Sequence, residues 1–205
     1  MMPDSSTIIN HLTEICNEIP TSLLAYFYFD FNDAKKQSAQ NCLALLVAQL
    51  CNQVDQIPEG LVDVYENCGR GSSIPKVNDL VSCIALFAKM EEVENIFLVL
   101  DALDECPKFE GDSQRTELLK VLETVNGFDS SNIHLIVTSR QEIDIRDALI
   151  PLLSVPALSI QGTPTASDIQ IYIRSQLSVE PKLSCWPADV KLEIETALSN
   201  GADGM

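Results

Sequence analysis

Several patterns that mark common functions are missing from these 205 residues. Basic residues are scarce, because 13 lysines and arginines stand against 30 acids, a formal charge of −17. A nucleic-acid or anionic-membrane surface needs clustered basic side chains, so the composition argues against both partners. No apolar run approaches the ~20 residues of a membrane span. The N-terminus has neither the basic nor the apolar part of a secretory signal. We therefore expect no nucleic-acid partner, no membrane partner and a cytoplasmic location.

Metal ligands and nucleophile motifs are also sparse. The two histidines, His11 and His134, lie far apart, and the seven cysteines include no Cys-x-x-Cys pair, which argues against a zinc site. Scattered cysteines of this kind are typical of reduced, buried thiols inside the cell. His134 lies within a predicted strand and is expected to be packed. No Gly-x-Ser-x-Gly element is present for a hydrolase. Cys106 has no histidine nearby in sequence and is expected to be a core or loop cysteine.

The absence with the largest consequence is that of a phosphate-binding loop. A Gly-x-x-x-x-Gly-Lys-Ser/Thr loop cradles nucleotide phosphates, and no lysine in this chain follows a glycine. The stretch Gly69–Ser73 contains two glycines, but no strand precedes it and no Gly-Lys follows, so it predicts a flexible connector. The net charge alone does not exclude ATP, because exposed charges are screened within about 8 Å at physiological salt.

The most informative segment that is present runs from Ile96 to Glu105. Five apolar residues lead directly into Asp101, and Asp104 and Glu105 follow. A continuous apolar run of this length predicts a parallel strand buried on both faces. Ligands of open α/β sheets bind at the carboxyl ends of strands. An aspartate there can hold Mg²⁺, and a neighbouring acid can orient or deprotonate an attacking water. The segment therefore predicts a Walker B strand; the alternative is a strand followed by a solvated acidic turn.

A second apolar segment is followed by an arginine. The predicted strand Ile133–Thr138 leads through Ser139 into Arg140, which places a guanidinium at the sheet edge that carries Asp101. Such an arginine can contact a γ-phosphate or the charge that develops in phosphoryl transfer. The alternative is a surface arginine paired with Glu142 or Asp144.

Helices and strands alternate along the chain, which predicts an α/β fold with a parallel sheet. We treat residues 1–205 as one domain, with the sheet and its helices in 1–161 and a helical extension in 162–205. Trp186 is expected to anchor the last helix to the core. The predicted strands are 23–29, 96–101, 133–138 and 156–161. The predicted helices are 6–17, 38–53, 61–68, 77–90, 113–125, 144–149, 167–177 and 188–198.

Four segments in this order resemble a known family, the NACHT or nephrocystin-like NTPase domain of fungal signalling proteins. Those proteins resemble vegetative-incompatibility factors and often carry ankyrin or WD repeats after the NTPase. The segments are Tyr-Phe-Tyr-Phe-Asp-Phe-Asn-Asp at 26–33, Phe-Leu-Val-Leu-Asp-Ala-Leu-Asp-Glu-Cys at 97–106, Ile-Val-Thr-Ser-Arg at 136–140 and Gly-Ala-Asp-Gly-Met at 201–205.

The resemblance implies a three-layer fold of the P-loop NTPase type and a role for each site residue. Asp101 would hold Mg²⁺ and contribute to nucleotide binding. Asp104 or Glu105 would handle the attacking water, and Arg140 would sense the γ-phosphate. The complete domain would bind Mg²⁺ with ATP or GTP. Its partners would be other protein subunits or repeat domains.

The resemblance also shows a departure. In the family, a strand and the phosphate-binding loop precede the helix that corresponds to residues 6–17, and here the chain starts just before that helix. That strand would lie between the strands 133–138 and 156–161, so a gap in mid-sheet is expected. We interpret the chain as a truncated core of a nucleotide-dependent signalling switch in intracellular non-self recognition, inactive alone and binding no cofactor.

Two alternatives remain at this stage. The first is a non-catalytic interaction module that keeps the fold and has lost nucleotide binding. The second is a response-receiver-like domain, which also gathers acids at a strand end. The latter fold resembles one that needs a lysine after a later strand, and neither 133–138 nor 156–161 is followed by one.

Overall fold

The computed structural model describes residues 3–108, 114–128, 132–158 and 163–201. The chain divides into two compact units, Met1–Leu153 and Ser154–Met205. Sequence analysis put this division between residues 161 and 162, because it assigned a strand to 156–161. Residues 156–158 lie in no strand, and residues 159–161 fall outside the described part of the chain. Leu158 is 95% exposed, so this stretch lacks the core contacts that a sheet strand would have.

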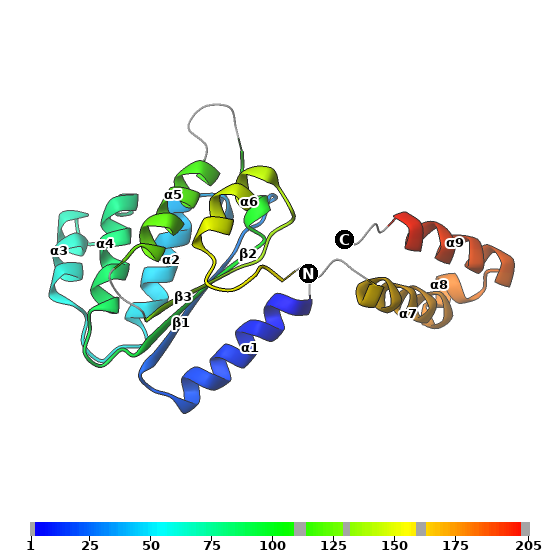
Figure 1. Ribbon diagram of the computed structural model, residues 1–205, viewed down its shortest axis with the longest axis horizontal. Helices are drawn as coiled ribbons and strands as arrows, with labels where there is room; N and C mark the ends of the chain where they lie inside the picture. The colour runs from blue at the N-terminus through cyan, green and yellow to red at the C-terminus, as the bar shows by residue number, and fades with distance from the viewer. Residues whose placement is uncertain (1–2, 109–113, 129–131, 159–162, 202–205) are drawn as a thin grey trace. The chain divides into compact units, whose positions relative to one another are not determined.

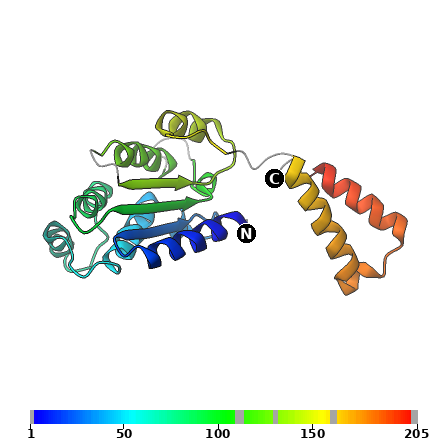
Figure 2. The ribbon, with the colours of Figure 1, turned by 60° about the horizontal axis from the view of Figure 1, so that its bottom comes forward.

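The first unit is built on three parallel strands in the order β1-β2-β3 (Figures 1 and 2). They are β1 (Ser22–Tyr28), β2 (Asn95–Asp101) and β3 (Ile133–Val137). Ser22 of β1 is paired with Asn95, and Ile96 of β2 with Ile133. The α/β class and the parallel sheet are thus confirmed, and each of these strands begins and ends within one residue of its predicted limits.

Helices connect the strands and cover the sheet. Before β1 comes α1 (Pro3–Glu18), and between β1 and β2 lie α2 (Ala39–Cys51), α3 (Glu59–Asn67) and α4 (Val77–Ala88). Next come α5 (Gln114–Asn126) and α6 (Ile143–Leu149), before and after β3. Short 3-10 turns occupy η1 (Ala34–Lys36), η2 (Leu103–Glu105) and η3 (Ile150–Leu152). Helix α2 begins after Ser38, whose hydroxyl accepts a hydrogen bond from the Asn41 backbone N–H at 3.4 Å. This N-cap satisfies one of the unpaired donors at a helix start.

The sheet has a hydrophobic cluster on each face. On one face, Ile9 and Leu12 of α1 pack with Leu24 and Val99. On the other, residues of α2, α4 and α5 such as Leu46, Ile84 and Leu118 form the larger cluster. Fully burying a side chain of this size contributes about 1.5–3 kcal/mol. The central strand β2 is buried on both faces, as its continuous apolar run predicts.

Side chains at the end of α2 and just after it close the outer edge of β1. Gln53 Oε1 accepts from the Leu24 N–H at 3.0 Å, and Gln53 Nε2 donates to the Leu24 carbonyl at 2.7 Å. Gln49 makes the same two bonds with Tyr26, at 3.1 and 2.8 Å. The two glutamines stand one helical turn apart and each bonds an outward-facing residue of the strand. Their carboxamides therefore take the place of a neighbouring strand.

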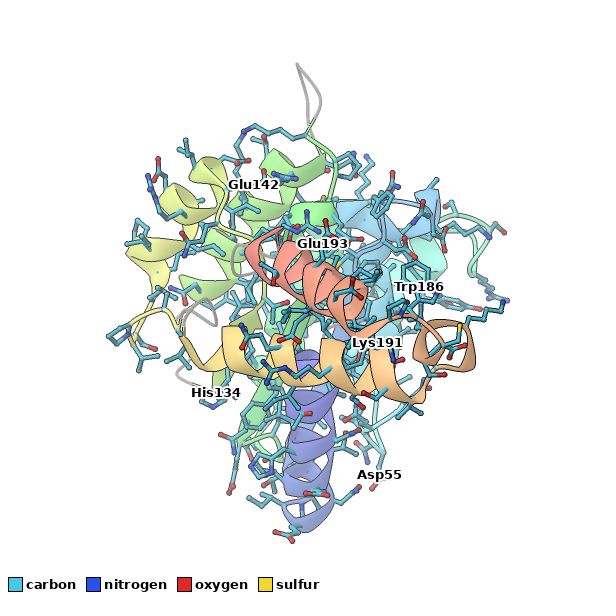
Figure 3. All side chains as sticks on the ribbon, turned by 90° about the vertical axis from the view of Figure 1, so that its right-hand side faces the viewer. Asp55, His134, Glu142, Trp186, Lys191 and Glu193 are labelled. Atoms are coloured by element: carbon cyan, nitrogen blue, oxygen red, sulfur yellow. The ribbon has the colours of Figure 1, made fainter. Side chains whose placement is uncertain are left out.

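The second unit consists of α7 (Thr163–Val179), α8 (Pro181–Ser184) and α9 (Ala188–Gly201). An ion pair of 2.7 Å between Arg174 and Glu195 joins α7 to α9, and the Lys191 ammonium donates to the Ser184 carbonyl at 2.7 Å. Trp186, labelled with Lys191 in Figure 3, is 44% exposed. The expectation that it is a core anchor is therefore wrong. Among the helices that the structure describes, none combines the length and apolar character needed to cross a membrane.

Candidate nucleotide site

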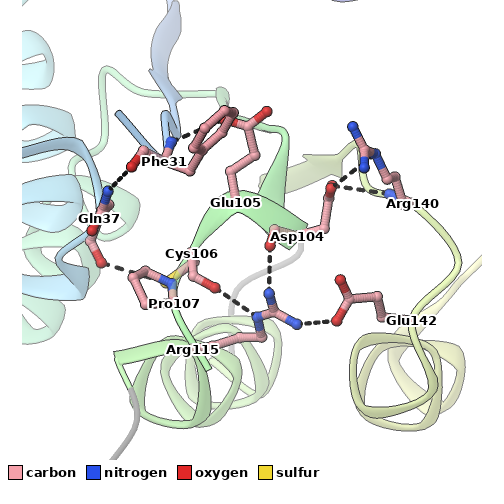
Figure 4. Close-up of a pocket in the computed structure, with 9 residues that line it drawn as sticks. All are labelled: Phe31, Gln37, Asp104, Glu105, Cys106, Pro107, Arg115, Arg140 and Glu142. Carbon is pink, nitrogen blue, oxygen red and sulfur yellow. Dashed lines mark hydrogen bonds and ion pairs between the residues drawn. The ribbon is translucent and has the colours of Figure 1, made fainter. Parts of the chain in front are cut away.

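A cavity of about 380 Å³ opens at the carboxyl ends of the strands (Figure 4). Three of the four predicted site residues, Asp104, Glu105 and Arg140, line it. Asp101 stands beside them at the tip of β2 but is not part of the lining. The other lining residues are Phe31, Gln37, Cys106, Pro107, Arg115 and Glu142.

Asp101 is fixed by a hydroxyl from the neighbouring strand end. Thr138 Oγ1 donates a hydrogen bond to Asp101 Oδ1 and accepts one from the Ala102 N–H at 3.0 Å. Ala102 has φ 57° and ψ 48°, a left-handed conformation that costs a residue with a Cβ about 1–2 kcal/mol. The turn it makes leads the chain from β2 into η2. Thr138 is a residue whose individual role sequence reasoning missed.

Asp104 holds Arg140. The Arg140 backbone N–H donates to Asp104 Oδ1 at 3.0 Å, and Arg140 Nε lies 3.4 Å from Asp104 Oδ2. The Asp104 side chain is only 9% exposed, whereas that of Arg140 is 65% exposed. Both oxygens of this carboxylate are therefore engaged. The terminal nitrogens of Arg140 make no recorded contact with the described residues and face solvent.

Glu105 reaches toward the end of β1. Its Oε2 accepts from the Phe31 backbone N–H at 3.1 Å, and the Phe29 N–H just before donates to the Asp101 carbonyl at 3.0 Å. The Phe31 ring is 67% exposed at the mouth of the cavity. The acid loop after β2 is thus tied to β1 on one side and to Arg140 on the other.

Arg115 of α5 is only 4% exposed and holds this loop through hydrogen bonds to its backbone. Its Nε donates to the Cys106 carbonyl at 2.8 Å, and Nη2 donates to the Asp104 carbonyl. Its Nη1 bonds Glu142 and lies 3.5 Å from Asp144 Oδ2. Figure 4 shows the contacts of Arg115 with Asp104, Cys106 and Glu142, which connect the loop to the start of α6.

The contacts of Arg115 argue against the alternative interpretation of Arg140 as a surface residue paired with Glu142 or Asp144, and they involve a residue that sequence analysis did not single out. The alternative partners considered for Arg140, Glu142 and Asp144, are paired with Arg115 instead. A sequence signal for Arg115 existed. It stands three and four residues before Leu118 and Leu119 on the buried stripe of α5, and a charged residue on such a stripe must find partners.

Two groups near the cavity have shifted pKa values. Burial raises the pKa of the Cys106 thiol to about 11, although the Arg115 charge opposes the shift. Cys106 therefore stays protonated at neutral pH, which is consistent with a structural role. Partial burial pushes the pKa of Asp144 upward. Hydrogen bonds from Lys108 and its own backbone, with the charges of Arg115 and Lys108, outweigh that effect, so its pKa lies below the usual value.

The carboxylates offer few free oxygens to a metal ion. Across the described residues, no group of three or more histidine, cysteine, aspartate or glutamate side chains could hold one. Asp101 Oδ2 and Glu105 Oε1 have no recorded protein partner, whereas both Asp104 oxygens are taken. One or two carboxylates fit Mg²⁺, which usually keeps several waters and takes further oxygens from substrate phosphates.

Comparisons with known proteins gave a family match and a weak structural match. No curated protein matches the chain. A chain in a solved structure of Drosophila ORC bound to AT-rich DNA and Cdc6 aligns with 97% of this chain and 81% of its own length. Identity is 17% and the TM-score 0.28, too low to carry a structural argument. The model of the family described as nephrocystin 3, N-terminal, matches residues 5–140, a stretch that includes Asp101, Asp104, Glu105 and Arg140. Because that match covers more than half of the sequence, the chain belongs to the nephrocystin 3 N-terminal family.

Proposed function

We propose that this chain is part of a nucleotide-dependent switch of the NACHT class, acting in fungal intracellular non-self recognition. One observation carries the proposal. Asp101 at the tip of β2 and Arg140 beyond β3 are held at the same sheet edge, the first by Thr138 and the second by Asp104. Nucleotide binding would shift such a domain between two conformations, and hydrolysis would reset it. Ankyrin or WD repeats would be its neighbours in the whole protein.

Asp101 is the residue we assign to Mg²⁺. Its Oδ1 is oriented by Thr138 and its Oδ2 is left for a metal or a metal-bound water. When bound, Mg²⁺ would neutralise charge on the phosphates. The protein's contribution is to keep the carboxylate at the strand tip in one orientation, which the double role of the Thr138 hydroxyl supports.

Glu105 is the better candidate for the acid that orients water. Both oxygens of Asp104 are engaged by Arg140, and its side chain is nearly buried. Glu105 keeps one oxygen without a recorded partner and lines the cavity. We therefore assign Asp104 to positioning Arg140, and Arg140 to contacting the γ-phosphate of ATP or GTP through its exposed terminal nitrogens.

The donors that usually hold phosphates are not among these 205 residues. The N-terminus of α1 offers a helix dipole worth about 0.3–1 kcal/mol to an exposed anion, whereas micromolar binding needs about 8 kcal/mol. We therefore expect no specific ATP or GTP binding by this chain below millimolar concentration. A thermal-shift titration with Mg-ATP at 100 µM tests this, and a stabilisation that Asp101→Asn removes would show that the chain binds nucleotide unaided.

The activity test begins by sequencing the transcript upstream of Met1. If that upstream sequence encodes a phosphate-binding loop, the longer protein should hydrolyse Mg-ATP or Mg-GTP. Asp101→Asn should abolish hydrolysis, and Glu105→Gln should slow it while nucleotide binding persists. Undiminished turnover in Asp101→Asn would overturn the assignment of the metal ligand.

An alternative function is a protein-interaction module that has lost nucleotide binding. The absence of a phosphate-binding loop from these 205 residues favours it. A longer protein that carries such a loop and still binds no nucleotide would decide for this alternative.

A further inference from the structure

Among the described residues, Arg115 is the one charged side chain that is buried, and it is 4% exposed. Burying a charge is costly unless the charge is paired and hydrogen-bonded. Replacing a buried ion pair by well-packed apolar side chains is often neutral or stabilising, so stability alone does not explain an arginine on the apolar stripe of α5. The contacts of its guanidinium point to a second role.

On one side, the guanidinium holds the loop that carries Glu105. Its Nε donates to the Cys106 carbonyl at 2.8 Å, and its Nη2 donates to the Asp104 carbonyl. These two carbonyls belong to the residues before and after Glu105. Since the Glu105 N–H also donates to the Ala102 carbonyl at 2.9 Å, the backbone on both sides of this glutamate is fixed.

On the other side, the guanidinium holds the segment that carries Arg140. Its Nη1 bonds Glu142 Oε2 and lies 3.5 Å from Asp144 Oδ2. The Glu142 N–H in turn donates to the Arg140 carbonyl at 2.9 Å. In Figure 4 the guanidinium lies between the acid loop and Glu142. The planar fork of an arginine can bond partners in two directions at once, whereas a lysine offers a single charged point on a flexible stem.

We propose that Arg115 is a positioning residue that couples Glu105 to Arg140. The inference rests on the proposed function, in which Glu105 orients water and Arg140 contacts the γ-phosphate. These two residues follow different strands, and the Asp104 carboxylate joins their segments directly. Because Arg115 bonds the Asp104 carbonyl and also the segment after Arg140, it keeps the two backbones at a set separation before any nucleotide arrives. Phosphoryl transfer depends on positioning of this kind.

Two amides report on the segments that Arg115 joins. The Arg140 N–H donates to Asp104 Oδ1 at 3.0 Å, and the Phe31 N–H donates to Glu105 Oε2 at 3.1 Å. Their hydrogen-exchange rates, measured residue by residue on this chain without nucleotide, test the coupling. Arg115→Met should speed both about tenfold, because the acid loop opens more often once its two carbonyls are released.

Leu118→Ala is the matched control. Leu118 lies on the same helix, is fully buried and belongs to the larger hydrophobic cluster, so its truncation lowers the stability of the fold while the guanidinium and its partners remain. After correction for the free energy of unfolding of each variant in urea, the Arg140 and Phe31 amides should stay slow in Leu118→Ala. Equal acceleration in the two variants would overturn the proposal, because Arg115 would then act only through overall stability.

Glu142→Ala tests the connection from the side of α6. The Glu142 side chain is 39% exposed, so this variant should fold even if Arg115→Met does not. The Phe31 amide should exchange about threefold faster in Glu142→Ala, and the double variant with Arg115→Met should be no faster than Arg115→Met alone. An unchanged Phe31 amide in Glu142→Ala, or two effects that simply add, would contradict coupling through Arg115.

Hydrolysis by a longer protein that carries a phosphate-binding loop gives a second measurement. Arg115→Met should lower kcat about tenfold with little change in KM, because other groups bind the nucleotide and only the arrangement of Glu105 and Arg140 is lost. A raised KM with unchanged kcat would overturn the positioning role. Absence of hydrolysis in the native longer protein would count against the proposed function, whereas the exchange rates of the present chain would still decide the role of Arg115.

Discussion

The two outer strands of the sheet, β1 and β3, differ in how their outward backbone groups are satisfied. At β1, the carboxamides of Gln49 and Gln53 bond the N–H and C=O of Tyr26 and Leu24. At β3, no side chain among the described residues does this for Ile133, Leu135 or Val137. The side chains follow the same division, because Leu23, Leu24, Ala25 and Phe27 of β1 are buried and those of β3 are not.

This difference shows which edge of the sheet could add a strand. An edge that two glutamines have closed cannot add a strand without losing four side-chain bonds, whereas an open edge gains bonds when a strand arrives. The open strand also leads into Thr138 and Arg140, which belong to the candidate site.

The largest effect should come from opening the closed edge. The double variant Gln49→Ala with Gln53→Ala leaves the Leu24 and Tyr26 backbone groups without partners. The two Leu24 groups are part-buried and the two Tyr26 groups are exposed to water. Because each buried orphan costs about 1–3 kcal/mol, the free energy of unfolding in urea should fall by about 2–6 kcal/mol. Light scattering should also detect more association than in the native protein, because the uncovered edge of β1 could then accept a strand.

Gln40→Ala is the matched control for that variant. Gln40 lies on the same helix but bonds the Ile74 and Pro75 carbonyls in a loop at 3.3 and 2.8 Å. It should leave the association state unchanged. Equal association in the control and the double variant would mean that the glutamines do not protect β1.

A smaller effect is expected on the inner side of β3, where Thr138 joins the strand end to β2. Thr138→Val removes the hydroxyl that serves both Asp101 and the Ala102 N–H. Leaving these groups unpaired should lower the free energy of unfolding by about 1–3 kcal/mol. Thr138→Ser keeps a hydroxyl and should recover most of the loss in the same urea titration. Equal stability of the serine and valine variants would exclude the hydroxyl as the cause.

The smallest effect concerns pH and the segment that follows β3. Because the folded-state pKa of Asp144 is depressed, the ionised carboxylate stabilises the fold above its unfolded pKa, and this contribution is lost as pH falls through the folded value. Asp144→Asn should therefore reduce the loss of stability between neutral and acid pH, measured by urea titration at each pH. An unchanged pH dependence in this variant would show that Asp144 makes no contribution.

The strands, the helices and the location of the site residues could be predicted from the sequence, because local patterns determine them. The apolar run of 96–100 predicted β2, and the acids after it were placed at the sheet edge because parallel strands end together. Apolar periodicity predicted the helices, although their limits were less exact. Helix α1 starts three residues earlier than predicted and α7 four, and Ser38, predicted as the first helical residue, is the N-cap of α2. The positions of Asp101, Asp104, Glu105 and Arg140 needed only strand ends and strand direction.

Other features could not be read from the chain because they depend on contacts between distant residues. The bonds from Gln49 and Gln53 to β1 join residues more than 20 apart in sequence. Nothing in the helix pattern shows that two exposed-type residues lie against a strand edge. The sequence shows Arg115 as a charged residue on the apolar stripe of α5. It does not show which residues Arg115 contacts. The predicted strand 156–161 is wrong at residues 156–158, the part that the structure describes, because a short apolar stretch does not specify a strand without tertiary contacts.

Amide hydrogen exchange, measured residue by residue on this chain, tests the difference between the edges most directly. The Leu24 and Tyr26 amides should be protected, because the glutamine carboxamides bond them. The Leu135 and Val137 amides have no recorded partner among the described residues and should exchange rapidly. The Ile136 amide faces β2 and should exchange slowly. Protection of Leu135 that equals that of Leu24 would contradict the account.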